Sequence, residues 1–340
     1  MKMYKQFLVL ILIITVSSCS TDRLKVDVSH VDLELTHKRL DQSFLPIQKE
    51  SLTPQAEFIQ TEIGGFSAVF FSYILQARNL SDSTLLRLSE EDIYPLVMEV
   101  QQGINAMESE INDQVQLLET GFKHLKYHFP ETSIPEVVLM NSWFQYGVFT
   151  TDSTLAVGLD FFIEDSALQR LYPPQFYAYM KTDMTPDYIA TNAMYGWLYN
   201  KVFPTEGEEN TLIDHMVYKG KVRYLLEAMF PDVEEATIMN YTQKELDWCY
   251  KKQLAVWREL TKLREDNTPA IYETKKTEIS KWVAQGPFTA ALSEEATDRM
   301  GEWIGLQMIR DYMRENPEVS VNDMLTKNSR QISKYYNPKN

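Results

Sequence analysis

The first nineteen residues have the layout of a secretory signal, which fixes the compartment in which the rest of the chain folds. Two lysines among the first five residues are followed by an apolar run from Phe7 to Val16. Two serines then precede Cys19, and this order matches the lipobox of a bacterial lipoprotein. The apolar run is too short to span a membrane as a helix. We therefore expect residues 1–18 to be a signal peptide that is removed, and Cys19 to carry acyl chains such as palmitate that anchor the protein.

The remaining chain is acidic and has one further cysteine. With 48 acidic against 33 basic side chains, the formal net charge of the whole sequence is −15. Such a surface repels the phosphates of nucleic acids and of anionic lipids, so we expect no nucleic-acid partner and attachment to the membrane through lipid. Once Cys19 carries lipid, Cys249 has no cysteine left for an internal disulfide. Because Cys249 lies in a helical pattern, we expect a buried structural thiol.

The hydrophobic pattern predicts an α+β fold that is predominantly helical, with many helices and a small, mostly antiparallel sheet. Residues 135–140 form an apolar run typical of a strand, and residues 146–151 and 154–159 flank an Asp-Ser turn in the pattern of a hairpin. A further short strand is expected within residues 25–35. Helices are expected over residues 97–128, with an interruption near Gly103 left open, and over residues 174–181, 186–202, 210–229, 243–264, 300–316 and 321–333.

The mature chain offers no clean boundary between two folded domains. Its first residues contain few bulky apolar side chains, so we expect residues 19–29 to be a lipidated tether and residues 30–340 to form one domain. Within that domain, the spacing of Gly301 and Gly305 favours close contact between two helices. Asp160 follows a predicted strand, and we expect it to cap the next segment.

Residues that could carry catalysis are sparse. Of the five histidines, His124 and His128 have the i, i+4 spacing that places two metal ligands on one helix face. The pair lacks the glutamate that a zinc peptidase uses as general base, and histidines near a helix end also stabilise that end electrostatically. No Gly-x-Ser-x-Gly elbow and no glycine-rich phosphate loop occur. We therefore expect no catalytic residue, no metal ion and no cofactor.

Five further stretches form an ordered set along the chain. They are Val157–Phe162, Thr211–Lys221, Tyr241–Thr242 with Trp248, Gln285–Phe288 and Gly301–Gln307. This set, behind a lipobox, resembles the gliding-motility lipoprotein GldB family of Bacteroidetes over nearly the whole mature chain. Residues 37–41 are similar to an early Arg-Phe-Asp signature of that family, with leucine in place of phenylalanine. The resemblance implies a role in gliding motility or in the linked protein-secretion machinery.

The family in turn is similar to predicted zinc peptidases, so the resemblance implies a zincin-like fold with a degenerate metal motif. In those peptidases one helix carries His-Glu-x-x-His and a second helix supplies a glutamate. The expected first helix has Asn192 and no ligand, and Lys219 stands where the second would supply glutamate. An ammonium group cannot bind zinc. The resemblance therefore implies a degenerate cleft that Asn192 and Lys219 face; alternatively, both are ordinary surface or buried hydrogen-bonding residues.

Three functions stay open on the sequence. We favour a non-enzymatic envelope lipoprotein that binds another envelope component, a protein partner above all. The second is an atypical zinc-dependent peptidase with a site built from His124, His128 or His215, and the third is a solute-binding lipoprotein. Ser20 follows Cys19, whereas an aspartate at that position commonly retains lipoproteins in the inner membrane. Together with the resemblance, this favours the outer membrane, with the protein facing the periplasm.

Overall fold

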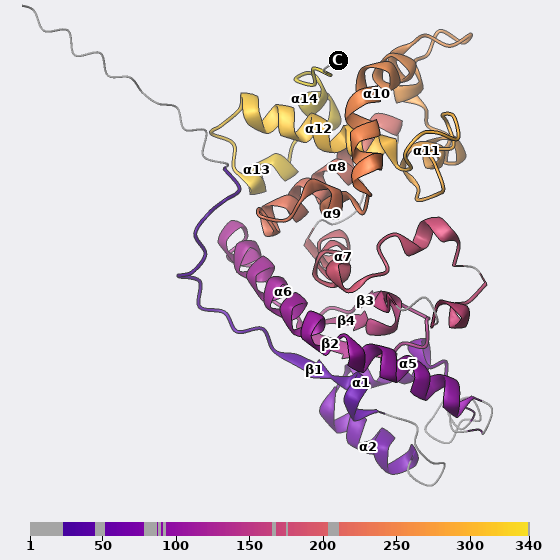
Figure 1. Ribbon diagram of the computed structural model, residues 1–340. Coiled ribbons are helices and arrows are strands. Elements are labelled where there is room, and N and C mark those ends of the chain that lie inside the picture. Colours follow the sequence, from indigo (N-terminus) through magenta and orange to yellow (C-terminus); the bar gives the residue numbers. More distant parts are fainter. Residues whose placement is uncertain are drawn as a thin grey trace, which may run out of the picture.

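Helices make up most of the protein, and the strands form one small sheet (Figure 1). The computed structural model describes residues 23–44, 52–77, 87, 90, 93–164, 168–174, 176–202 and 211–338. The predicted signal peptide and Cys19 therefore lie outside the described residues. Within those residues, no helix is both long enough and apolar enough to cross a membrane. The fold is α+β and predominantly helical, as predicted.

The sheet is mixed, and its strands lie in the order β1-β2-β4-β3. The strands are β1 (His37–Arg39), β2 (Glu136–Met140), β3 (Val148–Thr150) and β4 (Thr154–Gly158). β3 and β4 form the predicted hairpin, but β1 pairs with β2, and β2 with β4, in parallel. The prediction of a mostly antiparallel sheet is therefore wrong. Parallel neighbours need a long crossover, and the helices between residues 40 and 135 supply one between β1 and β2.

The predicted strand within residues 25–35 does not form, and β1 begins just after it. Leu35 is buried, and its backbone N–H donates a hydrogen bond of 3.1 Å to the carboxylate of Glu119. The segment thus contacts a helix side chain where a strand would pair with its neighbour. Its β-forming residues are explained by packing against the core instead.

Part of the predicted tether lies against the domain. Leu24 and Val28 are buried, and the guanidinium of Arg23 donates a hydrogen bond of 2.7 Å to the carbonyl oxygen of Met313. In Figure 1 this segment runs from the neighbourhood of α13 along the side of α6 to β1. The division of the chain into signal peptide, tether and domain stays a prediction.

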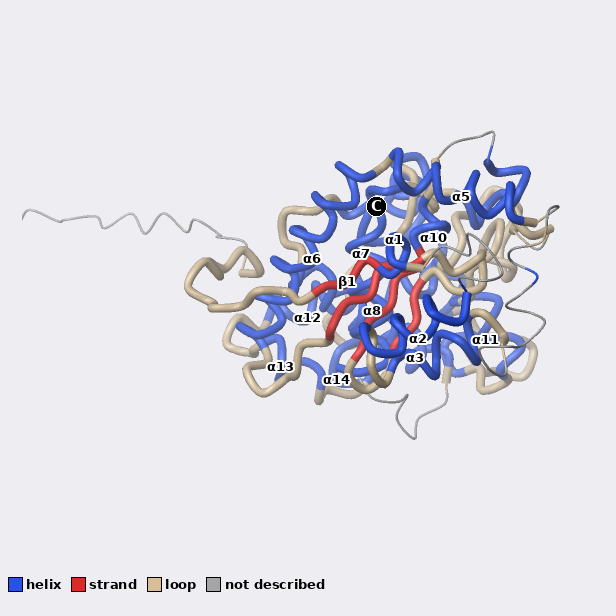
Figure 2. The backbone as a smooth tube through the Cα atoms, turned by 90° about the horizontal axis from the view of Figure 1, so that it is seen from below, coloured by secondary structure: helices blue, strands red, loops and turns tan. Residues whose placement is uncertain are grey.

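The sheet separates two hydrophobic clusters, and Figure 2 shows its strands lying side by side among the helices. Successive side chains of a strand point to opposite faces. Accordingly, Val137 and Leu139 join the large cluster, whereas Val138 and Met140 join the small one. The small cluster is completed by α1 (Leu40–Ser43), α2 (Leu52–Glu62), α3 (Phe66–Val69) and the π-helical turn Phe70–Ile74. Burial on both faces explains the unbroken apolar run of β2.

The large cluster lies among the remaining helices. These are α5 (Tyr94–Ala106), α6 (Glu108–His128), α7 (Ile189–Trp197), α8 (Leu212–Met229), α9 (Glu235–Met239), α10 (Gln243–Thr261), α11 (Lys276–Val283), α12 (Met300–Glu315), α13 (Val321–Leu325) and α14 (Ser329–Ser333), with short 3-10 or π turns at Leu159–Phe162, Leu168–Leu171, Ala178–Lys181, Pro186–Tyr188, Leu198–Val202 and Ala270–Tyr272. Three expectations were wrong in detail. The helix predicted over residues 97–128 is divided at Met107, and the helix predicted over residues 321–333 is divided into α13 and α14. Of the helix predicted over residues 174–181, the described residues form only the 3-10 turn Ala178–Lys181.

Two glycines allow α8 and α12 to approach closely. A Cβ atom added to Gly305 would overlap the carbonyl oxygen of Met216, and one added to Gly220 would overlap the backbone of Gly305. The close helix contact predicted from the spacing of Gly301 and Gly305 is therefore confirmed, and its partner helix is α8.

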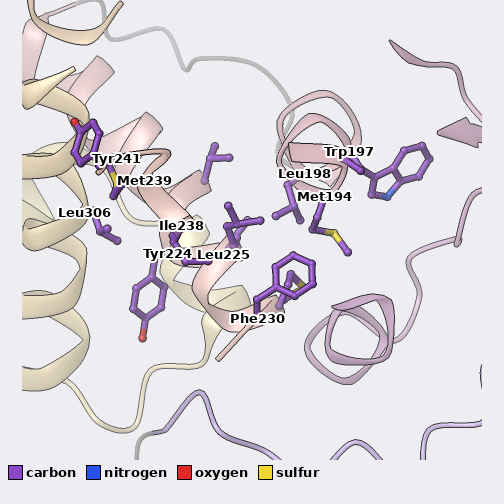
Figure 3. Packing of buried hydrophobic residues seen from close by; sticks show 14 of the residues in the cluster. Met194, Trp197, Leu198, Tyr224, Leu225, Phe230, Ile238, Met239, Tyr241 and Leu306 are labelled. Atoms are coloured by element: carbon purple, nitrogen blue, oxygen red, sulfur yellow. The ribbon is translucent and has the colours of Figure 1, made fainter. Parts of the chain in front are cut away.

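Large hydrophobic side chains pack the end of α7 against the C-terminal part of α8. Figure 3 shows Met194 and Leu198 directed toward Leu225 and Phe230. All four side chains are almost completely buried in the large cluster. Because α7 also packs against α6, β3 and β4, only part of its surface, which includes Asn192, is left to line the pocket.

Cys249 lies within α10 and is a buried free thiol. Burial raises the pKa of this thiol above its usual value, so it stays protonated at neutral pH. The prediction of a buried structural thiol is confirmed.

Candidate functional site

A pocket of about 420 Å³ lies where α7, α8 and the start of α12 meet the segment before α7. Asn192 on α7 and Lys219 on α8 both line it, so the structure brings together the two residues predicted to face a degenerate cleft. Cavities of roughly 300–1,000 Å³ are typical of small-molecule sites. The pocket has a polar side and an apolar side, which come from different elements.

Part of the polar side comes from α7 and α8. The buried side of α7 packs on α8 (Figure 3), and Asn192 lies on the pocket side. α8 begins at a capping box in which Thr211 and Asp214 each bind the other's backbone N–H. Lys219 and Arg223 follow four residues apart on that helix, a spacing that places both on one face. Both side chains line the pocket.

Asn240, Asn192 and Asp183 form a hydrogen-bonded cluster at one part of the wall. Asn240 ends α9 with a φ of 56°, in the left-handed region that asparagine adopts more readily than most residues. Its side-chain amide donates to the carboxylate of Asp183 and, at 2.7 Å, to Oδ1 of Asn192. The amide of Asn192 lies 3.4 Å from the same carboxylate of Asp183. The carboxylate is thus held by amides and has no salt bridge among the described residues.

A buried ion pair joins α8 to α12 beside this cluster. Nε of Arg223 lies 2.5 Å from Oε1 of Glu302, and the two side chains are only 4% and 1% exposed. The guanidinium also donates to the carbonyl oxygen of Ile238 and lies 4.3 Å from the centre of the Tyr195 ring. Burial alone would raise the pKa of Glu302, but Arg223 and Lys219 outweigh it and hold that pKa below its usual range. Glu302 is therefore ionised at neutral pH.

Arg299 is bound in a similar way at the start of α12. It has a φ of 48°, and its Nε donates to the carboxylate of Asp298 at 3.0 Å. A second nitrogen donates to the backbone carbonyl oxygen of Asn240 at 3.2 Å. The charge of Arg299 is thus compensated by Asp298, and the side chain braces the turn that carries Asn240.

Lys219 differs from the two arginines of the pocket. Its side chain is half-buried, and it forms no salt bridge within the described part of the chain. Its Nζ lies 5.6 Å from the centre of the Tyr199 ring. An ammonium so placed is attracted by the ring face, yet keeps its capacity to donate hydrogen bonds.

The apolar side of the pocket comes mainly from the segments between β3 and α7. Its side chains are Val148, Phe161, Phe162, Phe176, Met180 and Met184, with Val283 from α11. Aromatic and aliphatic walls of this kind bury the apolar part of a ligand.

Asp160 holds the loop that packs against part of this apolar wall. Trp143 and Phe144 both have a φ of 56°, an unusual conformation for two consecutive bulky residues. The buried carboxylate of Asp160 accepts from the N–H of Ser142 at 2.8 Å and from the N–H of Phe144. The ring of Phe144 packs against Phe161 with centres 6.2 Å apart. The prediction that Asp160 caps the following segment is wrong, because its carboxylate is bound by the preceding loop.

The histidines lie elsewhere, and the pocket does not fit a zinc site. His124 and His128 are on α6 and His215 is on α8, and none of them lines the pocket. Burial lowers the pKa of His128 to about 4. Throughout the part of the chain that the structure describes, no group of three or more His, Cys, Asp or Glu side chains could hold a metal ion. The amides, the lysine and the arginine-bound Glu302 are not a ligand set for zinc.

Several lining residues carry no prediction from the sequence, among them Arg223, Glu302, Asp183 and Asn240. Arg223 lies one helical turn after Lys219, so the spacing could have indicated it. Glu302 lies inside the Gly301–Gln307 stretch, which was explained by helix packing alone. Asp183 and Asn240 carry no local signal, because they reach Asn192 only through the tertiary fold.

Comparison with known proteins identifies the family. The family model described as gliding motility protein GldB matches residues 21–338. No curated protein and no solved structure matches the chain, so the zincin-like part of the resemblance stays a prediction. Because the match spans nearly the whole sequence, the chain belongs to the GldB family of gliding-motility lipoproteins of the cell envelope.

Proposed function

We propose that this protein is a non-enzymatic lipoprotein that serves gliding motility or the linked protein-secretion machinery by binding another envelope component in its pocket. Acylated Cys19 anchors it, and the absence of aspartate at Ser20 favours the outer membrane, with the domain facing the periplasm. The partner is a protein of the envelope.

The charge arrangement of the pocket carries this proposal. Both Lys219 and Asn192 line the pocket, and by the family resemblance they lie on the two helices that would supply ligands in a metallopeptidase. The buried carboxylate of Glu302 is bound by Arg223, so it is not free to act as a general base. What remains is a pocket whose wall is held by buried ion pairs and amide contacts, an arrangement suited to recognition.

Crosslinking in living cells tests this function. Gln285 is exposed and lines the pocket, so a photo-crosslinking amino acid placed there in the full-length protein reports what enters. We expect one discrete crosslinked product with an envelope protein. The product should be lost when Lys219→Met is added, at unchanged abundance of the protein.

Two controls give this experiment its meaning. The same probe at exposed Glu318, which does not line the pocket, should not give the product. Cys19→Ala should release the protein from the membrane fraction and weaken the crosslink. The same product from Gln285 and Glu318, or a product that Lys219→Met leaves unchanged, would show that the pocket is not the binding site.

A further inference from the structure

Two charged side chains that line the pocket form no salt bridge within the part of the chain that the structure describes, although the charge of Lys219 helps to keep Glu302 ionised. Arg223 is compensated by Glu302 and Arg299 by Asp298, whereas Lys219 and Asp183 form no salt bridge among the described residues. One wall therefore offers an ammonium donor and another a carboxylate acceptor. Because the protein as a whole is acidic, the ammonium group of Lys219 distinguishes this pocket from the rest of the protein more than the carboxylate of Asp183 does.

Each part of the pocket selects a different chemical group. Lys219 attracts an anion, and a carboxylate forms a charge-assisted hydrogen bond with an ammonium group. Asp183 accepts hydrogen bonds and repels a second anion, so it favours a neighbouring N–H group. Phe161, Phe176 and Met180 offer a wall that buries an aromatic or aliphatic group.

These three groups occur together at the free end of a polypeptide. We propose that the pocket binds the C-terminal end of a peptide whose last residue is aromatic or aliphatic. Lys219 binds the terminal carboxylate, Asp183 accepts from a backbone N–H, and the apolar wall holds the last side chain. This inference rests on the proposed function, because it names the ligand of the same pocket.

A fatty acid is the other source of a carboxylate with an apolar body in an envelope. It has no N–H to donate, so Asp183 would lose hydrogen bonds to water without a replacement. The chemistry of Asp183 therefore favours the peptide.

Calorimetric titration of the full-length protein in detergent micelles tests the assignment. The probes are the tripeptide acetyl-Ala-Ala-Phe with a free carboxyl group, the same tripeptide with a C-terminal amide, and octanoate. We expect the free acid to bind at least about tenfold more tightly than the amide, since a charge-assisted hydrogen bond is lost in the amide. Octanoate should bind more weakly than the free acid.

The variants separate recognition from folding. Lys219→Met should weaken binding of the free acid about tenfold and leave the amide unchanged, so the preference between them disappears. Lys252→Met, at an exposed position on α10 outside the pocket, should retain the preference. Asp183→Asn should reduce the difference in binding affinity between the tripeptide acid and octanoate.

Three results would overturn the inference. Equal binding of acid and amide would show that Lys219 does not recognise the carboxylate. Octanoate binding at least as tightly as the tripeptide acid would assign the pocket to a lipid acid. No binding of any probe at millimolar concentration would exclude a simple carboxylate ligand. In each case, a crosslink from Gln285 that depends on Lys219 would still support the pocket as the binding site for an envelope component. If the probes do not bind as expected and this crosslink is also absent, the proposed function is contradicted as well.

Discussion

Replacement of Gly305 by alanine is expected to lower the free energy of unfolding by about 3 kcal/mol or more. The added methyl group would overlap the carbonyl oxygen of Met216, which belongs to the backbone of α8 and cannot rotate away. α8 and α12 would have to separate, and the side chains between them would lose contact. Urea unfolding of the full-length protein in detergent, followed by far-ultraviolet circular dichroism, measures the change.

Gly65→Ala is the matched control for this substitution. Gly65 has a φ of −60°, and no atom lies within 4 Å of the position that its Cβ would take. Alanine there restricts the unfolded chain and should leave stability unchanged or raise it by about 0.5 kcal/mol. Similar losses at Gly305 and Gly65, or none at Gly305, would contradict the close packing of α8 on α12.

Arg223→Met is expected to cost about 3–5 kcal/mol of stability at neutral pH. The substitution leaves the carboxylate of Glu302 buried without its cation and removes the donor to the carbonyl oxygen of Ile238. Arg258→Met, at an exposed position of α10, is the control and should change stability by less than about 0.5 kcal/mol. Chemical unfolding of the two variants at pH 7 gives the comparison.

The effect of Arg223→Met should depend on pH in a defined direction. In the natural protein the pKa of Glu302 lies below the usual 4.5, so the ionised group contributes stability above that value and loses it as the pH falls through the lowered pKa. Burial is already the largest single influence on Glu302, and without Arg223 only Lys219 and Arg299 oppose it, so we expect the pKa of Glu302 to rise. The variant should then gain stability relative to the natural protein as the pH is lowered from 7 to 5. A constant difference across this range would mean that Glu302 is not the cause.

Local patterns predicted the hairpin and the close helix contact, because each depends on residues near one another in sequence. The turn between β3 and β4 and the glycine spacing of α12 are signals of this kind. Parallel pairing of β1 with β2 joins segments separated by several helices, and no local pattern encodes it. The apolar run of β2 is compatible with either direction of pairing. Hence β2, β3, β4 and the hairpin were predicted, whereas β1 and the parallel pairing were not.

The site was predictable to a similar extent. Asn192 and Lys219 were singled out because the family resemblance indicated two helices, and the structure places both on one pocket. Asp183 and Asn240 reach that pocket through a 3-10 turn and a left-handed helix end, which depend on tertiary contacts. Asp160 was predicted to cap the segment that follows it in the sequence. In the structure its buried carboxylate instead accepts a hydrogen bond from the loop that precedes it.

The claim that the pocket recognises a ligand without metal chemistry is tested most directly by metal content. The full-length protein is purified from membranes without chelators, and its zinc is measured by elemental analysis. We predict much less than one zinc per chain, unchanged by His124→Ala or His128→Ala. About one zinc per chain that is lost on either substitution would contradict the account and indicate an atypical zinc peptidase.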